Sequence, residues 1–395
     1  QIVGGILPTV WDGGDAIHQT LRNNMPDYRW PGTAINLPLR NGCGHDFIEK
    51  FIARAGMLIA FSRKINQIEI QQAENSKEIF NWRPERLCGI DKISSGCIQV
   101  SKRERIRVVK FDLGEGSLLL PVNSEGFKEL PDSMPNIWVT APITESEKLG
   151  FAINAMFEID AGRSRLAANS KFNQEIGEKL GLKFESLLLK MLNSDWDTRR
   201  SQLLLSKDLS QYHFVLSLWN TLLSKFRYID KESEVRLIAG ELLSTGLGGL
   251  SRNNKIVPNG LPDSFGSLLS WPEIRTVLKG GLECPRILSA LCETECFNTV
   301  LDMKTAVTSE VSTWLRILVP DYASATDQWV SLDLNAFIEK IGASQKRISL
   351  ADSKILGQVL NQDAAALIRE FGQEASNDFE RAVTQLAELS FMADD

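Results

Sequence analysis

The sequence predicts an α+β protein, because strand-like and helix-like apolar patterns both occur, in different stretches of the chain. Short runs rich in β-branched and aromatic residues recur between residues 65 and 160, as expected for buried strands. Apolar residues at helical spacing run from Phe172 to Met191 and return beyond Asn193. A chain of 395 residues is too long for one compact core, so we expect two or three domains.

Composition excludes several classes of protein. With 43% apolar and 24% charged residues, the chain has the make-up of an ordinary globular protein. A net charge of −6 argues against a general nucleic-acid-binding surface. No apolar run reaches bilayer length, and no signal-peptide pattern opens the sequence, so we expect no membrane association. The six cysteines show no ligand spacing, which favours reduced thiols in a cytoplasmic protein and predicts no metal site.

The most informative stretch runs from Ile137 to Leu192. Residues 137–140 and 151–159 have the character of buried strands, separated by a loop. The second strand leads into Arg163-Ser-Arg165, where the chain must turn before the helix opens. The pattern therefore places two guanidinium groups on a short turn between a buried strand and a packed helix.

Two interpretations of this turn remain open. A turn held rigid on both sides can aim its arginines at an anion, because guanidinium groups repel each other and have no place in a core. A solvated turn with two surface arginines fits the same spacing, since pairs of arginines are common in turns.

Residues Val139 to Leu192 resemble the junction of the sacsin family and its bacterial relatives. There a strand ending in a leucine- or alanine-proline pair, here Ala141-Pro142, leads through a loop to an apolar strand, an arginine turn and a long helix. In the wider GHKL superfamily, the heat-shock-ninety chaperones have Ser-Arg followed four residues later by Gln. This chain has Ser164-Arg165 followed four residues later by Asn169.

The resemblance implies roles for these side chains. In the family, the arginine reaches from the second domain to the γ-phosphate of ATP held in the first. Arg165 is then the expected phosphate sensor, Asn169 its companion, and Arg163 the alternative. Asn169 is one methylene shorter than the family's Gln, which shortens its reach toward a nucleotide.

A second resemblance lies between Trp30 and Arg40. Gly32-Thr33 followed by alternating apolar residues predicts a turn into a strand, and Pro38 places that strand at an edge or ends it. The block is similar to the sacsin-type sequence that marks the last strands of the ATP-binding domain. The resemblance implies that Thr33, with Gly32, stands beside the adenine pocket.

The resemblance also divides the chain. Residues 1–71 are expected to hold the C-terminal part of a GHKL ATP-binding domain, a tail strand and helix. Residues 72–194 are expected to form an α/β sandwich middle domain, and residues 195–395 an all-α C-terminal domain. In this last part, helical stripes are predicted at Phe214–Phe226, Val235–Leu243, Ile274–Val277 and Val311–Leu318, and Gly246-Leu-Gly-Gly-Leu is interpreted as a helix end.

The run Lys102 to Arg107 is basic and lies on a predicted strand. Alternation along the strand places its charges on the outer face of a sheet. A solvated sheet face is the favoured interpretation, with contact to nucleic acid as the weaker one.

The implied activity is that of an ATP-dependent, chaperone-like machine, with bacterial antiphage defence as one setting. Because the chain begins with Gln1 and lacks most ATP ligands of the family, we expect ATP and Mg²⁺ to be bound mainly by residues upstream. The chain alone should not hydrolyse ATP. Expected partners are a protein client or partner subunit, including a second copy. The alternative is a non-enzymatic helical interaction scaffold with a degenerate nucleotide domain.

Overall fold

The computed structural model describes residues 44–62, 64–65, 67–72, 76–101, 104–144, 147–162, 164–261, 266–279, 305–319 and 329–332. The chain divides into two compact units, Gln1–Ile52 and Ala53–Asp395, and the architecture below is that of the second. The expectations for Gly32, Thr33 and Arg163 fall outside the described residues.

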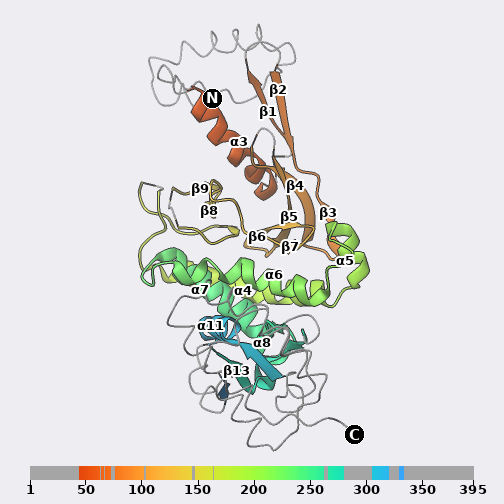
Figure 1. Ribbon diagram of the computed structural model, residues 1–395. Helices are drawn as coiled ribbons and strands as arrows, with labels where there is room; N and C mark the ends of the chain where they lie inside the picture. Colours follow the sequence, from red (N-terminus) through yellow and green to blue (C-terminus); the bar gives the residue numbers. More distant parts are fainter. Residues whose placement is uncertain are drawn as a thin grey trace, which may run out of the picture. The chain divides into compact units, whose positions relative to one another are not determined.

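A mixed sheet forms the middle of this unit (Figure 1). Its strands run in the order β3-β4-β5-β6-β10-β8-β9, with β7 paired to β6. Neighbours are antiparallel except β10 and β8, which are parallel. The strands are β3 (Glu85–Arg86), β4 (Ile93–Gln99), β5 (Arg105–Asp112), β6 (Gly116–Asn123), β7 (Gly126–Phe127), β8 (Ile137–Val139), β9 (Ala141–Pro142) and β10 (Ala152–Ala155).

Strand β6 lies at the centre of the sheet and is covered on both faces. All of its residues except Asn123 are buried, which explains why its sequence is a continuous apolar run rather than an alternating one. A separate hairpin of β1 (Gln67–Gln72) and β2 (Ser76–Asn81) precedes the sheet in the chain. The strands expected between residues 65 and 121 are confirmed.

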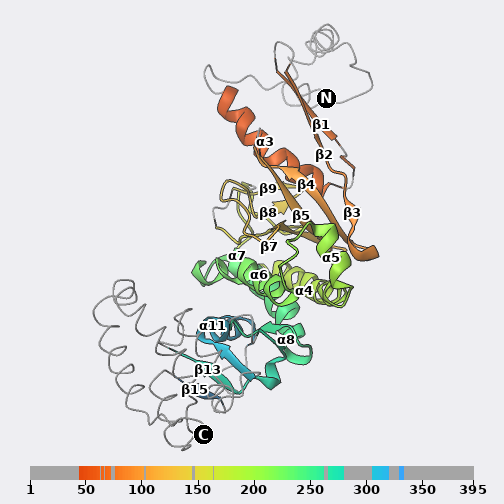
Figure 2. The ribbon, with the colours of Figure 1, turned by 45° about the vertical axis from the view of Figure 1, so that its right-hand side comes forward.

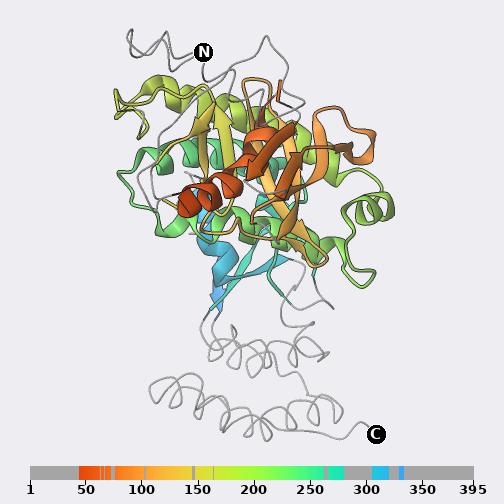
Figure 3. The ribbon, with the colours of Figure 1, turned by 90° about the horizontal axis from the view of Figure 1, so that it is seen from above.

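One face of the sheet packs against the second half of helix α3 (Gly44–Phe61), the orange-red helix in Figure 3. Met57, Ala60 and Phe61 form a buried cluster with residues of β4, β5 and β8. The ring of Phe61 lies 5.5 Å from that of Trp138. Gly56 lets the helix approach closely, since a Cβ there would lie 2.5 Å from the Gln99 carbonyl oxygen.

The opposite face packs against helix α4 (Lys171–Leu192), which confirms the helix expected there. Leu180, Phe184 and Leu188 are fully buried. Phe184 meets Phe111 of β5 edge-on, with the ring centroids 5.2 Å apart. Edge-to-face pairs add about 0.5–1.5 kcal/mol to the apolar area that they bury.

Further helices follow α4 in the chain (Figures 1 and 2). They are α5 (Trp196–Leu203), α6 (Gln211–Leu223), α7 (Glu234–Leu243), a π-helical segment (Ser244–Gly248) and α8 (Gly249–Asn253). The π-helical segment, α7 and α8 contact α4, whereas α6 contacts β7 and α5 contacts the turn at Leu87–Gly89. None of the helices in the described ranges combines the length and apolar character that a membrane crossing needs.

The interpretation of Gly246 as a helix end is wrong. The π-helical segment carries the chain from α7 into α8 without interruption. Small residues are required there because neighbouring elements approach the backbone. A Cβ at Gly246 would lie 2.9 Å from the Phe184 ring, and one at Gly248 would lie 2.6 Å from the Leu318 carbonyl oxygen.

The expectation of an all-α domain over residues 195–395 is also wrong, because the described part contains strands. These are β11 (Val257–Pro258), β12 (Leu268–Leu269), β13 (Thr276–Leu278), β14 (Ala306–Thr308) and β15 (Val330–Leu332). The last three form a parallel sheet in the order β14-β13-β15, next to helix α11 (Ser309–Leu318). Ile274–Val277 was expected to be helical but leads into β13. The prediction failed because a short buried parallel strand lacks the apolar–polar alternation that would identify it.

A single hydrophobic cluster extends from Leu87 in the sheet region to Val319 after α11. Residues on either side of the expected boundary at 194/195 therefore share one core. The mixed α+β character of the chain is confirmed.

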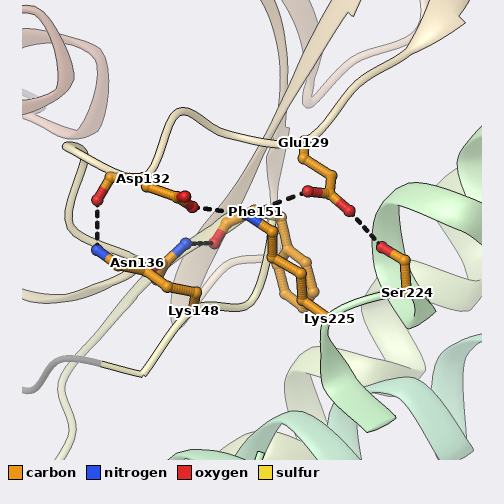
Figure 4. Close-up of polar contacts among 7 residues, drawn as sticks. All are labelled: Glu129, Asp132, Asn136, Lys148, Phe151, Ser224 and Lys225. Atoms are coloured by element: carbon orange, nitrogen blue, oxygen red, sulfur yellow. Dashed lines mark hydrogen bonds and ion pairs between the residues drawn. The ribbon is translucent and has the colours of Figure 1, made fainter. Parts of the chain in front are cut away.

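A polar cluster also joins the sheet to the helical layer (Figure 4). Lys225, after α6, forms ion pairs with Asp132 (2.6 Å) and Glu129 (3.1 Å). Ser224 donates a hydrogen bond to Glu129, and Asn136 donates one of 2.7 Å to the backbone carbonyl of Phe151 at the start of β10. Although partial burial opposes it, the hydrogen bonds to the two carboxylates raise the pKa of Lys225.

Helix α5 carries a fully buried arginine, Arg199. Its Nη1 donates to the Met191 carbonyl oxygen, whereas Nε and Nη2 have no hydrogen-bond partner among the described residues. Its guanidinium lies 5.1 Å from the ring centroid of Trp196 and 5.3 Å from that of Phe214. Loss of solvation on burial lowers the pKa of Arg199 to about 10.

Two replacements of Arg199 separate the free-energy cost of burying its charge from the stabilisation that its side chain provides by filling space. Arg199→Met keeps most of the volume and should leave stability unchanged or raise it by about 1–4 kcal/mol, as found for other buried ions. The Met191 carbonyl keeps a donor in Ser194 Oγ, at 2.6 Å. Arg199→Ala should be less stable than Arg199→Met by about 2–5 kcal/mol because it leaves a cavity. Urea unfolding measures both, and equal losses would contradict the explanation.

Alanine substitutions at two helical glycines, one tightly packed and one not, test how closely the backbone of α4 is packed. Gly181→Ala should lower the free energy of unfolding by about 1–3 kcal/mol, since overpacking forces backbone shifts. Its new Cβ would lie 2.8 Å from the Leu242 carbonyl oxygen. Gly240→Ala in α7 meets only the Phe226 ring at 3.5 Å. It should stabilise by up to about 1 kcal/mol through helix propensity. Thermal unfolding of the two variants should shift in opposite directions.

Candidate functional site

The arginine turn follows β10 and precedes α4, as the sequence predicts. An isolated β-bridge pairs Ile159 with Leu166, and the Asp160 N–H donates to the Arg165 carbonyl oxygen at 2.9 Å. The chain between them reverses direction within a few residues.

The carboxylate of Asp160 holds this turn closed. Its Oδ1 accepts hydrogen bonds from the backbone N–H groups of Ser164 (2.8 Å) and Arg165 (3.2 Å). Its Oδ2 accepts one from the Ser164 hydroxyl at 3.0 Å. Hydrogen bonds from the Arg165 and Ser164 backbone lower the pKa of Asp160, because they favour the ionised form.

The loop after β9 supports the turn from outside. Both the backbone N–H and the hydroxyl of Thr144 donate to the Ser164 carbonyl oxygen, each at 3.1 Å. Ser164 is therefore bound through its N–H, hydroxyl and carbonyl. The residue before Arg165 has little freedom to move.

A second set of contacts joins the end of the strand region to the start of α4. Ser170 is the N-cap of α4 and accepts from the Asn173 N–H, while its hydroxyl donates to Glu158 at 2.5 Å. The buried side chain of Asn173 accepts from the Glu158 N–H at 2.7 Å and donates to the Glu158 carbonyl at 3.0 Å. Glu158, which precedes the arginine turn, is thus bound to the first turn of α4.

Arg165 itself is exposed. Its backbone is fixed by Asp160, yet its guanidinium makes no hydrogen bond or ion pair with the part of the chain that the structure describes. The positive charge of Arg165 attracts the nearby Asp160 carboxylate and contributes to the lowered pKa of Asp160. The arrangement is a cation on a rigid base with its head group available to an anion.

Asn169 lies just before the N-cap of α4. Its backbone adopts φ 54°, a left-handed conformation that asparagine tolerates. Its N–H donates to Glu234 of α7 at 2.6 Å, and its side chain is exposed. Within the described residues no hydrogen bond joins Asn169 to Arg165, and its visible role is to direct the chain into α4.

The residues that position the turn were not identified from the sequence. Asp160 had a local signal, since aspartate at the start of a turn commonly accepts from backbone N–H groups a few residues later. Glu158, Asn173 and Glu234 had none, because their partners lie 12 to 65 residues away. Among the residues with described positions, no group of three or more His, Cys, Asp or Glu side chains is placed to hold a metal ion.

Removing the Asp160 carboxylate should loosen the turn without unfolding the chain. In Asp160→Ala, hydrogen exchange at the Ser164 and Arg165 amides should accelerate at least about tenfold, since each loses a charge-assisted acceptor of roughly 1.5–3 kcal/mol. Asp112→Ala, which removes the acceptor of the Gly114 amide at another turn, serves as the control.

The same contact predicts a pH dependence. Because the pKa of Asp160 is lowered, its stabilising effect is complete above the ordinary aspartate value of about 3.9 and disappears only as the pH falls through the lower folded-state value. The Ser164 and Arg165 amide shifts in an NMR titration should therefore have midpoints below that value. Midpoints above it would contradict the assignment.

No protein-family model matches the sequence, and no curated protein and no solved structure matches the chain. The family resemblance of the arginine turn and of the Gly32-Thr33 block therefore stays a prediction.

Proposed function

We propose that the chain is part of an ATP-dependent, chaperone-like conformational machine in which Arg165 contacts the γ-phosphate of ATP. The nucleotide would be held, with Mg²⁺, by a GHKL-type domain whose ligands lie mainly upstream of Gln1. The observation that supports this proposal is the exposed guanidinium of Arg165 on a turn fixed by Asp160 and by the start of α4.

A positioned arginine can act on a triphosphate in two ways. It can stabilise the charge that develops during phosphoryl transfer, an effect of roughly 10³–10⁵ in rate where arginine fingers are known. It can also bind two domains around ATP and so convert the state of the nucleotide into a change of shape. Both need a guanidinium whose base does not move, which is what the contacts of Ser164 and Arg165 provide.

The remaining site residues have supporting parts in this proposal. Arg163 would supply a second cation on the same turn. Asn169 would direct the chain into α4 and extend its amide toward the nucleotide. Thr33, with Gly32, would lie beside the adenine. The machine would act on a protein client or partner subunit, and antiphage defence is one cellular setting that the resemblance offers.

The test uses the natural full-length polypeptide, with its ATPase rate and ATP affinity measured separately. Arg165→Ala should lower kcat by roughly 10³-fold, as for other arginine fingers, while the Kd for ATP changes less than about threefold. Arg165→Lys should recover little, because an ammonium group cannot form the two parallel hydrogen bonds of guanidinium. Arg252→Ala is the matched control, since Arg252 is also exposed and lies in α8.

Three outcomes would contradict the proposal. Equal loss of rate and affinity in Arg165→Ala would assign the turn a structural role. Unchanged kinetics would remove Arg165 from the site. A full-length protein that does not bind ATP would favour a non-enzymatic interaction scaffold.

A further inference from the structure

A small concavity at the β4–β5 end of the sheet is lined by three arginines, Arg83, Arg105 and Arg107. Its volume is about 190 Å³, and we call it the arginine pocket. Uncharged polar groups and an apolar wall complete it: Asn81, Ser95, Cys97, Gln99, Ile79 and Phe80. It shares no lining residue with the arginine turn.

Strand register explains how the arginines come together. Arg105 lies opposite Gln99, and Arg107 lies opposite Cys97. Residues directly opposite each other on antiparallel strands point to the same face. Ile98 and Ile106, the intervening residues, lie opposite each other and belong to the cluster that packs against α3. Arg105 and Arg107 therefore lie on the other face of the sheet, about 7 Å apart along the strand.

The charges in the arginine pocket are poorly compensated. Arg83 and Arg105 are exposed, and their guanidinium groups form no hydrogen bond or ion pair in the described part of the chain. Arg107 is half-buried, and its Nη1 donates to the hydroxyl of buried Ser95 at 3.3 Å. That contact orients one guanidinium without neutralising it.

One carboxylate, Glu85, also lines the arginine pocket. It lies opposite Ser95 in the β3–β4 ladder, and no ion pair joins it to the three arginines. The pocket thus carries three positive charges against one negative charge, although the whole chain has a net charge of −6. Local excess of this kind draws anions to a concave surface.

The chemistry of the arginine pocket favours a phosphate group. Guanidinium groups bind phosphate through two parallel hydrogen bonds, and several of them can share its oxygens. Ser95, Asn81 and Gln99 add hydroxyl and amide groups, while the exposed side chain of Ile79 provides apolar surface for a carbon skeleton. Liquid water occupies about 30 Å³ per molecule, so the volume is of the order of a few water molecules and suits a small ligand.

We propose that the arginine pocket binds the phosphate group of a small phosphorylated metabolite. A nucleic-acid strand fits less well, because binding along a strand needs an extended basic groove with several stacking aromatics. The overall negative charge of the chain also opposes a long polyanion. The site does not depend on the role proposed for Arg165.

The chain contains its own reporter for this site. Cys97 is a free, exposed thiol that lines the arginine pocket, whereas Cys88 is a free thiol outside it. Alkylation by iodoacetamide, which is uncharged, can be followed at each cysteine separately by peptide mass spectrometry. Cys88 then serves as an internal control for changes in reagent or in folding.

Glucose 6-phosphate should slow alkylation of Cys97 at least threefold at saturation and leave Cys88 unchanged. Inorganic phosphate should protect at higher concentration, since it lacks the carbon skeleton, and sulfate at equal ionic strength should protect least. If inorganic phosphate protected Cys97 and glucose 6-phosphate did not, the site would bind the free ion, and the proposal of a phosphorylated metabolite would be overturned. Equal protection by all three would mean screening only and would overturn the proposal.

Variants test whether the arginines carry the binding. In Arg105→Gln/Arg107→Gln, the glucose 6-phosphate concentration for half-protection should rise at least tenfold, whereas Glu85→Gln should lower it. Arg252→Gln removes the same type of charge elsewhere and should change nothing, and circular dichroism confirms folding of each variant. Unchanged protection in the double variant would overturn the proposal, as would stronger protection by a deoxythymidine 20-mer than by glucose 6-phosphate. Arg165→Ala should leave protection intact, which separates this site from the proposed ATP contact.

Discussion

The packing of α4 between the sheet and the helical layer is the constraint on which the rest of the described structure depends. On one side Phe184 meets Phe111 of β5, and on the other Gly177 and Gly181 allow α7 and the π-helical segment to approach. A glycine in a helix interior costs about 1 kcal/mol relative to alanine. Close packing on both sides of the helix offsets that cost, because interiors at crystal-like density gain many dispersion contacts.

This packing also decides where Arg165 can be. The N-terminus of α4 is bound to Glu158 through Ser170 and Asn173, and Glu158 ends the segment that leads into the turn. The helix cannot shift along its axis without breaking these hydrogen bonds or the contacts of Phe184. The backbone of exposed Arg165 is therefore held in place by the packing of buried helix α4. Rigid support of this kind is what a phosphate contact requires, since misplacement of a binding group by 1 Å can reduce a rate about 10²-fold.

How much could be predicted from the sequence depended on how local each signal was. The helix at 171–192 and the strands between residues 65 and 121 have local apolar patterns, and both are confirmed. The turn before α4 was expected where the strand pattern gives way to the helical one, and it lies there. Strand β13 is three residues long and buried, so it has no alternation to distinguish it from a helix. The π-helical segment at Ser244–Gly248 resembles a helix end because its glycines serve interhelical contact rather than termination. Asp160 is close in sequence to the groups that it binds, but Glu234 reaches the turn from 65 residues away.

Arginine illustrates why composition alone assigns no function. Arg199 and Arg200 are neighbours in α5, yet the first is fully buried beside Trp196 and Phe214 and the second pairs with Asp197 at the surface. Arg165 and the arginine pocket differ again, since their guanidiniums lack ion pairs within the described residues. The two regions are linked through β5 and α4, which share the Phe111–Phe184 contact. Coupling between sites needs an element with two stable arrangements, and packing this close favours one. Binding at the two regions should therefore be independent unless a partner supplies a second arrangement of α4.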